Sequence, residues 1–235
     1  MKLKKDKLEE AKRNAAIEAV KHVEDGFIVG LGSGSTAAYA IMEMGKRIRH
    51  EGLRVLGVPT SHQAFLLAVK NGIPITTLEE HPTLDLTIDG ADQVDEKLNL
   101  IKGMGGALAR EKIVAFSSKK LVIVVDESKK VKTLGEKNHP VPIEVLPFAA
   151  PFVTRKISEL GGKPKMRESS GKVGPIVTDN GNFIIDAYFG LIENPRELEQ
   201  KLKVIPGVVE NGLFVEITNI VYVGKFTGVE KLESK

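Results

Sequence analysis

Apolar residues recur in two different ways along the first 131 residues. Some segments carry them at helical spacing, and short uninterrupted apolar runs lie between those segments. We expect helices at 3–24, about 36–49, about 61–70 and around 111, and strands at 27–29, 54–58, 84–88 and 121–125. In the first helix one stripe at helical spacing includes Ala11, Ala15 and Ala19, and Ser61 is a candidate N-cap of the third. Strands that alternate with helices predict a parallel α/β sheet, so the main domain is expected to be Rossmann-like.

The pattern changes after residue 131, where prolines punctuate 140–151. Strands are expected at 141–145, 163–168, 175–178, 183–187 and 208–215, with helices at about 149–160 and after Pro195. The Asn180-Gly181 step between two apolar runs predicts a hairpin that joins 175–178 to 183–187. This order resembles the β-α-β-β-α-β split unit with one added strand, which is a ferredoxin-like α+β fold.

The two patterns predict two domains, and a length of 235 residues allows this. Residues 1–131 together with 218–235 are expected to form a catalytic α/β domain. The strand expected at 220–223 would return the chain to the main sheet. Residues 132–217 are expected to form an inserted, smaller α+β domain.

Composition narrows the class of protein. The net charge is only +3, and no dense Lys/Arg block stands beside aromatic residues, so nucleic-acid binding is not indicated. There are no cysteines, which excludes disulfides, thiol catalysis and thiolate metal sites. No apolar run approaches the roughly 20 residues that span a bilayer, and Lys and Glu recur where a signal peptide would be apolar. We therefore expect a cytoplasmic protein without a membrane partner.

Residues 30–36 (GLGSGST) join the first strand to the next helix. Backbone N–H groups at a helix start carry partial positive charge and bind phosphate, and the hydroxyls of Ser33, Ser35 and Thr36 add donors. The glycine spacing differs from that of dinucleotide-binding turns, and the lysine of a P-loop is missing. The motif therefore fits a small phosphorylated ligand, or simply a tight turn with Ser35 or Thr36 as N-cap. The motif alone leaves both interpretations open.

The stretch 84–114 concentrates charged side chains in one strand-loop-helix unit. Asp89 and Asp92 follow the apolar run 84–88, where the ends of parallel strands bind ligands. Two close carboxylates repel each other, so one of the pair can keep a proton and act as an acid. Lys102, beside glycines, suits phosphate or sugar oxygens or a developing oxyanion. Alternatively, Asp89 and Asp92 only form turns, and Lys102 is a solvated loop residue without a role in chemistry.

Glu111 is the strongest catalytic candidate that the pattern itself offers. It shares a helix face with Ala107, Leu108 and Ala115, which are apolar. A carboxylate on such a face is expected to be partly buried, and burial raises the pKa of a carboxylate toward the range of a useful base. Without those apolar neighbours it would be assigned to the surface.

The remaining residues exclude other chemistry. The five histidines, at 22, 50, 62, 81 and 139, have no ligand spacing, so no metal site is expected. No G-x-S-x-G elbow occurs, which disfavours a serine hydrolase. Neither a metal nor an organic cofactor is predicted.

The order of several short motifs resembles type A ribose-5-phosphate isomerase along nearly the whole chain. Each motif is modest alone, but their order and spacing together are specific. They are 30–36 (GLGSGST), 89–92 (DGAD), 102–108 (KGMGGAL), 110–113 (REKI), 125–129 (VDESK), 142–145 (PIEV), 178–182 (TDNGN) and 205–208 (IPGV).

The resemblance implies an enzyme of the pentose phosphate pathway that interconverts ribose 5-phosphate and ribulose 5-phosphate without a metal. It implies that Glu111 carries a proton between C1 and C2 through a cis-enediol, and that Asp89, Asp92 and Lys102 assist. It further implies a homodimer or homotetramer. The residues that would bind substrate are Ser33, Gly34, Ser35, Thr36, Asp89, Gly90, Ala91, Asp92, Lys102, Gly103, Met104, Gly105 and Lys129.

Other functions found on a similar fold fit the sequence less well. A non-catalytic sugar-phosphate-binding regulator would need a DNA-binding module, and the chain has only one helix before its first strand; it would also need no base at 111. A CoA transferase usually has a longer chain, and the glycine spacing of 30–34 does not match that of an NAD dehydrogenase.

Met104 interrupts the glycine run of the family pattern, which could alter the geometry of that loop.

Overall fold

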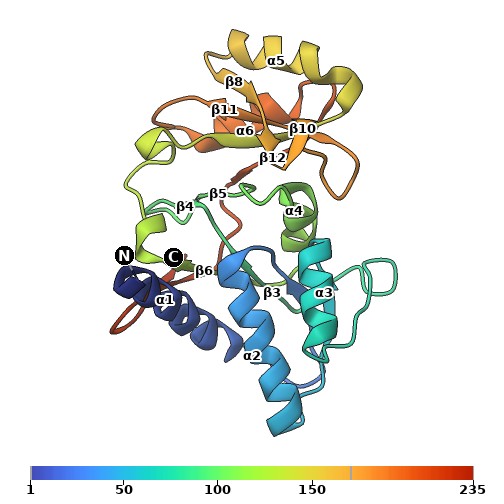
Figure 1. Cartoon of the computed structure of the whole chain (residues 1–235), viewed down its shortest axis with the longest axis vertical. Helices are drawn as coiled ribbons and strands as arrows, with labels where there is room; N and C mark the ends of the chain where they lie inside the picture. The colour runs from blue at the N-terminus through green and yellow to red at the C-terminus, as the bar shows by residue number, and fades with distance from the viewer. Residues whose placement is uncertain (1, 170, 235) are drawn as a thin grey trace. The chain divides into compact units, whose positions relative to one another are not determined.

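The structure is a computed structural model that describes residues 2–169 and 171–234. Its fold is mixed α/β with a mostly parallel central sheet, as the sequence predicts (Figure 1). The chain groups into two compact units. The first contains Met1–Ala91, Arg110–Lys130 and Ile217–Lys235, and the second contains Asp92–Ala109 and Val131–Glu216. In the described ranges, no helix has the length and apolar character needed to cross a membrane.

The first unit is built on a six-stranded sheet in the order β15-β14-β6-β3-β1-β2. Neighbouring strands pair in parallel except β14 and β15, which pair antiparallel. The predicted return of 220–223 to this sheet is confirmed as β14, whereas β15 was not predicted. The strands are β1 (Ile28–Leu31), β2 (Leu56–Pro59), β3 (Leu86–Gly90), β6 (Leu121–Asp126), β14 (Ile220–Lys225) and β15 (Gly228–Glu233).

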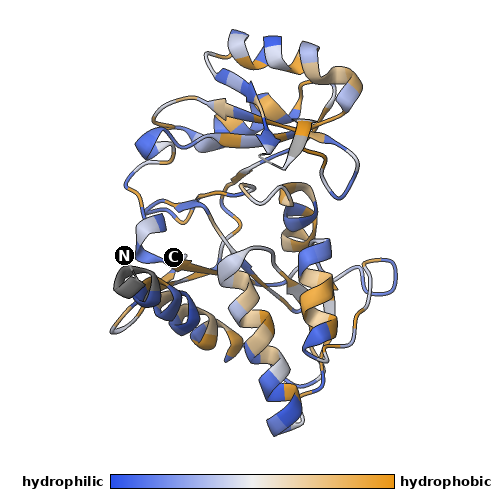
Figure 2. Cartoon of the chain, viewed as in Figure 1, coloured by the Kyte–Doolittle hydropathy of each residue, from blue (hydrophilic) through white to orange (hydrophobic). Residues whose placement is uncertain are grey.

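One face of this sheet is covered by α1 (Lys2–Val20) and α2 (Ser35–Glu51), with α3 (His62–Lys70) against α2 (Figure 1). The predicted alanine stripe of α1 is buried at Ala11, Ala15 and Ala19. Small residues let α1 approach closely: a Cβ on Gly224 would lie 1.8 Å from the Ala11 carbonyl oxygen. The C-terminal turns of α2 are hydrophilic (Figure 2).

The opposite face of the sheet receives α4 (Leu108–Phe116). Successive side chains of a strand alternate between faces, so Gly30 and Thr87 face away from α1 and α2. A Cβ on Gly30 would lie 2.5 Å from Cγ1 of Val114 on α4, which places that helix on this face. Glycine at position 30 therefore gives α4 its space.

The order of the strands creates a switch point between β1 and β3. The chain leaves β1 toward β2 at one edge, then returns through α3 to β3 on the other side of β1. In open α/β sheets, ligands bind outside the carboxyl ends of the strands at such a point. The two segments that emerge there are the Ser33 turn and Asp89.

The second unit contains an antiparallel sheet in the order β12-β7-β11-β8. With its two helices it has the split β-α-β-β-α-β order that was predicted. Pro195 occupies the first turn of α6, and Asn194 caps it, as the Asn-Pro sequence favours. The elements are β7 (Val141–Val145), α5 (Ala150–Glu159), β8 (Lys163–Met166), β11 (Phe183–Tyr188), α6 (Pro195–Lys203) and β12 (Val208–Asn211).

The predicted hairpin between 175–178 and 183–187 is wrong. β10 (Lys172–Pro175) pairs with β9 (Glu168–Ser169) instead, and β11 pairs with β7 and β8. The Asn180-Gly181 step still makes a tight turn, because the Thr178 N–H donates to the Asn182 carbonyl at 2.9 Å. The turn chemistry was identified, but not which strand β11 would pair with.

Residues 92–109 belong to the second compact unit, although the sequence grouped them with the first domain. Their short strands β4 (Gln93–Val94) and β5 (Leu100–Ile101) form a three-stranded sheet with β13 (Leu213–Phe214). This pairing joins segments more than a hundred residues apart, so local pattern could not reveal it. The predicted domain boundary at 132–217 stays a prediction.

The remaining elements among the described residues are three short 3₁₀ helices, η1 (Glu127–Lys129), η2 (Glu136–Asn138) and η3 (Pro147–Ala149).

A buried carboxylate anchors the turn that precedes β11. Glu144 of β7 is fully buried, and its Oε1 accepts hydrogen bonds from Thr178 Oγ1 at 2.9 Å, Asn180 Nδ2 at 3.0 Å and Asn182 Nδ2 at 2.8 Å. Buried charge is tolerated where donors surround it. This contact accounts for the PIEV and TDNGN motifs as one structural unit.

Replacing Glu144 with alanine should lower the free energy of unfolding by about 3 kcal/mol, because three side-chain donors lose their acceptor. Glu144→Gln keeps the accepting oxygen and should cost less than about 1 kcal/mol. Urea unfolding followed by circular dichroism measures both. Equal stability of Glu144→Ala and the parent would contradict this role.

Candidate active site

The turn after β1 exposes the start of α2. The N-cap of this helix is Gly34, at φ +96°, and no side chain caps it. Ser35 and Thr36 lie inside the helix rather than capping it, so the plain N-cap interpretation of those two residues is wrong. Backbone N–H groups at an uncapped helix start are suited to bind an anion.

The hydroxyl groups of three residues, Ser33, Thr60 and Ser61, form contacts that hold this turn. Ser33 Oγ lies 2.8 Å from Thr60 Oγ1 and donates to Ser61 Oγ at 2.5 Å. Thr60 donates to the Leu31 carbonyl at 2.9 Å, and Ser61 accepts the Ala64 N–H at 3.1 Å as the predicted N-cap of α3. Thr60 was not singled out from the sequence, because its partners come from distant segments.

Gln63 also contacts the turn, which the sequence did not predict. Its Oε1 accepts the Gly34 N–H at 2.9 Å, so the turn is held by side chains of the β2–α3 connection.

Asp89 closes the same turn from β3. The residue is 1% exposed, and its Oδ1 accepts the N–H of Ser33 at 3.0 Å and of Gly90 at 2.7 Å. A Cβ on Gly32 would lie 2.2 Å from this oxygen and 2.5 Å from the Asp89 Cα, so only glycine fits there. The structure thus brings Asp89 and the glycine/serine turn together at the switch point.

Glu111 is buried, as predicted, with 5% of its surface exposed. It lies one turn before Val114 on the same face of α4, and Val114 packs over Gly30 and Thr87. The first turn of α4 therefore points toward the carboxyl ends of the strands, where Asp89 lies. The expected burial is confirmed, while the catalytic role stays a prediction.

Lys129 lies in the η1 turn directly after β6, the strand next to β3. Asp126 caps this turn by accepting the Ser128 N–H at 3.0 Å. Lys129 is partly exposed. Its position after a central parallel strand suits a substrate contact, which stays a prediction.

The second unit holds five more of the predicted residues, which are Asp92, Lys102, Gly103, Met104 and Gly105. Lys102 is only 3% exposed, and its Nζ lies 5.4 Å from the centre of the Phe214 ring, so it is not a solvated loop lysine. The Asp92 carboxylate accepts the Met104 N–H at 2.9 Å. Gly103 has φ +103°, a conformation that favours glycine. The remaining predicted positions contribute backbone: Gly90 and Ala91 in the first unit, and Gly105 in the second.

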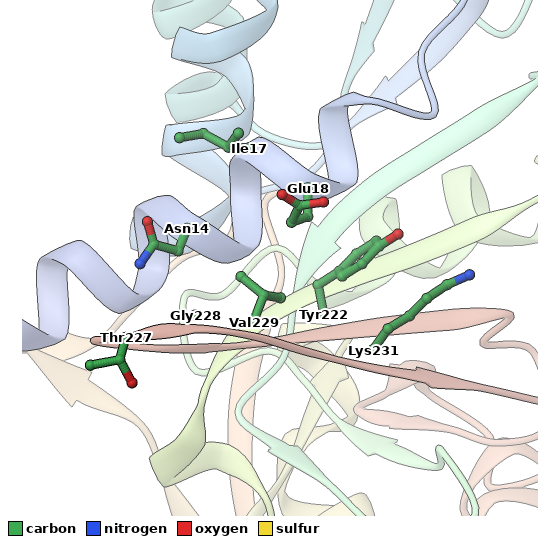
Figure 3. Close-up of a pocket in the computed structure, with 8 residues that line it drawn as sticks. All are labelled: Asn14, Ile17, Glu18, Tyr222, Thr227, Gly228, Val229 and Lys231. Atoms are coloured by element: carbon green, nitrogen blue, oxygen red, sulfur yellow. The ribbon is translucent and has the colours of Figure 1, made fainter.

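No group of three or more His, Cys, Asp or Glu side chains positioned to hold a metal ion occurs among the described residues. A separate pocket of about 580 Å³ lies between α1 and the β14–β15 hairpin (Figure 3). It is lined by Glu18, Tyr222 and Lys231 among others, and by none of the predicted site residues. Glu18 pairs with Lys21, and Lys231 pairs with Glu233, so both charges already have partners.

Replacing Gly32 with alanine should lower the free energy of unfolding by about 1–3 kcal/mol, because the new methyl group meets the Asp89 side chain and backbone. Gly171→Ala is the matched control, since a Cβ there meets nothing within 4 Å. Urea unfolding of the two variants gives the comparison. If Gly32→Ala were no less stable than Gly171→Ala, the close packing described above would be refuted.

Comparison with known proteins identifies the family. The family model described as ribose 5-phosphate isomerase A (phosphoriboisomerase A) matches residues 56–228. The ribose-5-phosphate isomerase A of Methanosarcina acetivorans is 52% identical over 94% of this chain and 93% of its own length. That of Thermococcus kodakarensis is 49% identical over 96% of this chain and 99% of its own.

Solved structures agree with the sequence comparison. Ribose 5-phosphate isomerase A from Methanocaldococcus jannaschii superposes with a TM-score of 0.92 at 49% identity, covering 96% of this chain and 99% of that one. A D-ribose-5-phosphate isomerase in complex with phospho-erythronic acid gives 0.93 at 46% identity, with the same two coverages. On the strength of the matched region, the identities and the shared fold, this chain belongs to the ribose 5-phosphate isomerase A family.

Proposed function

We propose that this protein interconverts ribose 5-phosphate and ribulose 5-phosphate by metal-free proton transfer through a cis-enediol(ate). Aldose–ketose isomerisation is the activity of the family to which the chain belongs. The observation that carries the mechanism is the burial of Glu111 on the sheet-facing side of α4. A carboxylate shielded from water in this way is a stronger base than an exposed one.

The phosphate of the substrate binds at the start of α2. The uncapped N–H groups after Gly34 and the hydroxyls of Ser35 and Thr36 supply donors, and the helix dipole favours an anion there. Lys129 adds a positive charge after β6. One solved relative is bound to phospho-erythronic acid, a phosphorylated sugar acid, which supports a ligand with one phosphate and a short polar chain.

The reaction moves one proton between adjacent carbons. Glu111 removes the proton from C2 of the open-chain aldose, which leaves a cis-enediolate with a double bond between C1 and C2. The same carboxyl then delivers a proton to C1, while O1 gains a proton and O2 loses one, giving the ketose. A base that is fixed beside both carbons serves both steps.

Asp89, Asp92 and Lys102 move the hydroxyl protons and stabilise charge. Asp89 and Asp92 exchange protons with the hydroxyls of the sugar. These exchanges open the ring, and they supply the proton that O1 gains and accept the proton that O2 loses. The Lys102 ammonium, buried beside the Phe214 ring, stabilises the negative charge of the enediolate. The backbone of Gly90, Ala91, Gly103, Met104 and Gly105 borders the substrate.

Assembly and location belong to the same proposal. Large apolar side chains are exposed in the second unit, including Phe148 at 99% and Val204 at 77%, which supports association of identical chains as a homodimer or homotetramer. We place the protein in the cytoplasm, without a nucleic-acid partner. A non-catalytic sugar-phosphate-binding regulator is the alternative, and it would bind ribose 5-phosphate without turning it over.

Glu111→Gln should lower kcat for ribose 5-phosphate about 10²- to 10⁴-fold, because the amide cannot accept the C2 proton, and should leave KM nearly unchanged. A coupled assay of ribulose 5-phosphate formation measures this. The matched control is Glu159→Gln on α5, whose carboxylate pairs with Lys156 at the surface and should not affect turnover. Full activity of Glu111→Gln would exclude Glu111 as the base.

Chelation tests the metal-free part of the proposal separately. After dialysis against EDTA and then against metal-free buffer, kcat should stay within about twofold of the untreated protein, because a carboxylate and an ammonium supply the acid–base and charge stabilisation. Loss of activity that returns on adding a divalent cation would show that a metal takes part.

A further inference from the structure

Arg167 spans two parts of the second unit. It lies where β8 ends and β9 begins, and its side chain is only 10% exposed. Its backbone is fixed on both sides, because its N–H donates to the Ile184 carbonyl at 2.9 Å and its carbonyl accepts the Ile176 N–H at 3.0 Å. The guanidinium therefore extends from a rigid base toward the 102–106 loop.

Two backbone carbonyls of this loop accept hydrogen bonds from Arg167. Nη1 donates to the Gly103 carbonyl at 2.9 Å and to the Met104 carbonyl at 3.0 Å. Nη2 lies 3.7 Å from the Met104 sulfur. A loop with glycines at 103, 105 and 106 has little conformational preference of its own, so contacts of this kind determine its shape.

Asp186 of β11 holds the guanidinium from the other side. Nε of Arg167 donates to Oδ2 at 2.9 Å and Nη2 donates to Oδ1, a two-point contact between planar groups. The Asp186 side chain is 11% exposed. An ion pair with this geometry and burial fixes the direction of the remaining Arg167 N–H groups.

The Gly103–Met104 peptide is held at both of its polar ends. Its carbonyl oxygen accepts from Arg167 Nη1, and its N–H donates to Asp92 Oδ2 at 2.9 Å. A cation at the oxygen and an anion at the N–H both align with the peptide dipole, so each contact strengthens the other. The orientation of the Asp92 carboxylate thus depends on a residue 75 positions later in the chain.

We infer that Arg167, fixed by Asp186, is a positioning residue that orients the Gly103–Met104 peptide and, through it, Asp92. This rests on the proposed function, which assigns Asp92 and the loop to the active site. Arg167 acts through the backbone and does not itself carry out the chemistry. Met104 contributes its N–H, carbonyl and sulfur to this arrangement.

Arg167→Met removes the hydrogen bonds while keeping a long apolar side chain. We expect kcat for ribose 5-phosphate to fall about 10- to 100-fold and KM to change less than about threefold, because the loop still forms but no longer holds Asp92 in place. Arg196→Met is the matched control, since Arg196 pairs with Glu216 at the surface, with both side chains more than 60% exposed. It should leave kcat and KM unchanged.

Hydrogen exchange observes the loop independently of turnover. The Met104 amide donates to Asp92 and the Gly106 amide donates to the Gly103 carbonyl at 3.0 Å, so we expect both amides to exchange slowly in the parent protein. In Arg167→Met their exchange should be at least about tenfold faster, with no change in Arg196→Met. If the parent protein proved unable to isomerise ribose 5-phosphate, the proposed function would fail, and this measurement would still decide the role of Arg167 in the loop.

Two further variants keep the inference testable if Arg167→Met does not fold. Arg167→Lys keeps the charge but lacks the fork that reaches carboxylate and carbonyls together, so kcat and exchange should be intermediate. Asp186→Asn should resemble it, and combining the two should cost less than the product of the single effects. The inference would be overturned if Arg167→Lys and Asp186→Asn kept the kcat and the loop exchange rates of the parent protein. It would also be overturned if the unfolded fraction of each variant fully explained its loss of activity.

Discussion

The contact between the Asp89 carboxylate and the turn after β1 is the constraint on which the first unit's site depends. The turn passes close to β3 because Gly32 has no side chain, and the Ser33 N–H then reaches the Asp89 oxygen. This contact joins the two strands that flank the switch point. It places an uncapped helix start beside a buried carboxylate, and the proposed mechanism uses the first to bind phosphate and the second in proton transfer.

The second unit uses the same physical principle in another form. Its 102–106 loop is rich in glycine, so its own sequence does not fix its shape. Asp92 and Arg167 fix one peptide of that loop from opposite ends, and Asp186 fixes Arg167. In both units a buried carboxylate fixes a segment next to predicted site residues: Asp89 of β3 holds the turn after β1, and Asp186 of β11 holds Arg167.

Much of this was predictable from local pattern. Helical spacing predicted the buried alanines of α1 and the burial of Glu111, and Ser61 was recognisable as an N-cap. The parts that were missed depend on distant partners. Thr60 acquires its importance from Ser33, β4 and β5 pair with β13, and Arg167 reaches Met104 across 63 positions. The hairpin prediction was wrong for the same reason, because the turn at Asn180-Gly181 does not determine which strands pair with β11.

In the proposed mechanism a carboxyl group transfers a proton, and no hydride moves, between two carbons of a sugar phosphate. Prolonged incubation of the protein with ribose 5-phosphate in D₂O, followed by NMR of both sugars, tests it most directly. The account predicts deuterium on C1 of ribulose 5-phosphate and on C2 of the recovered ribose 5-phosphate, because the base exchanges its proton with solvent between turnovers. Complete equilibration of the two sugars without deuterium on either carbon would contradict it.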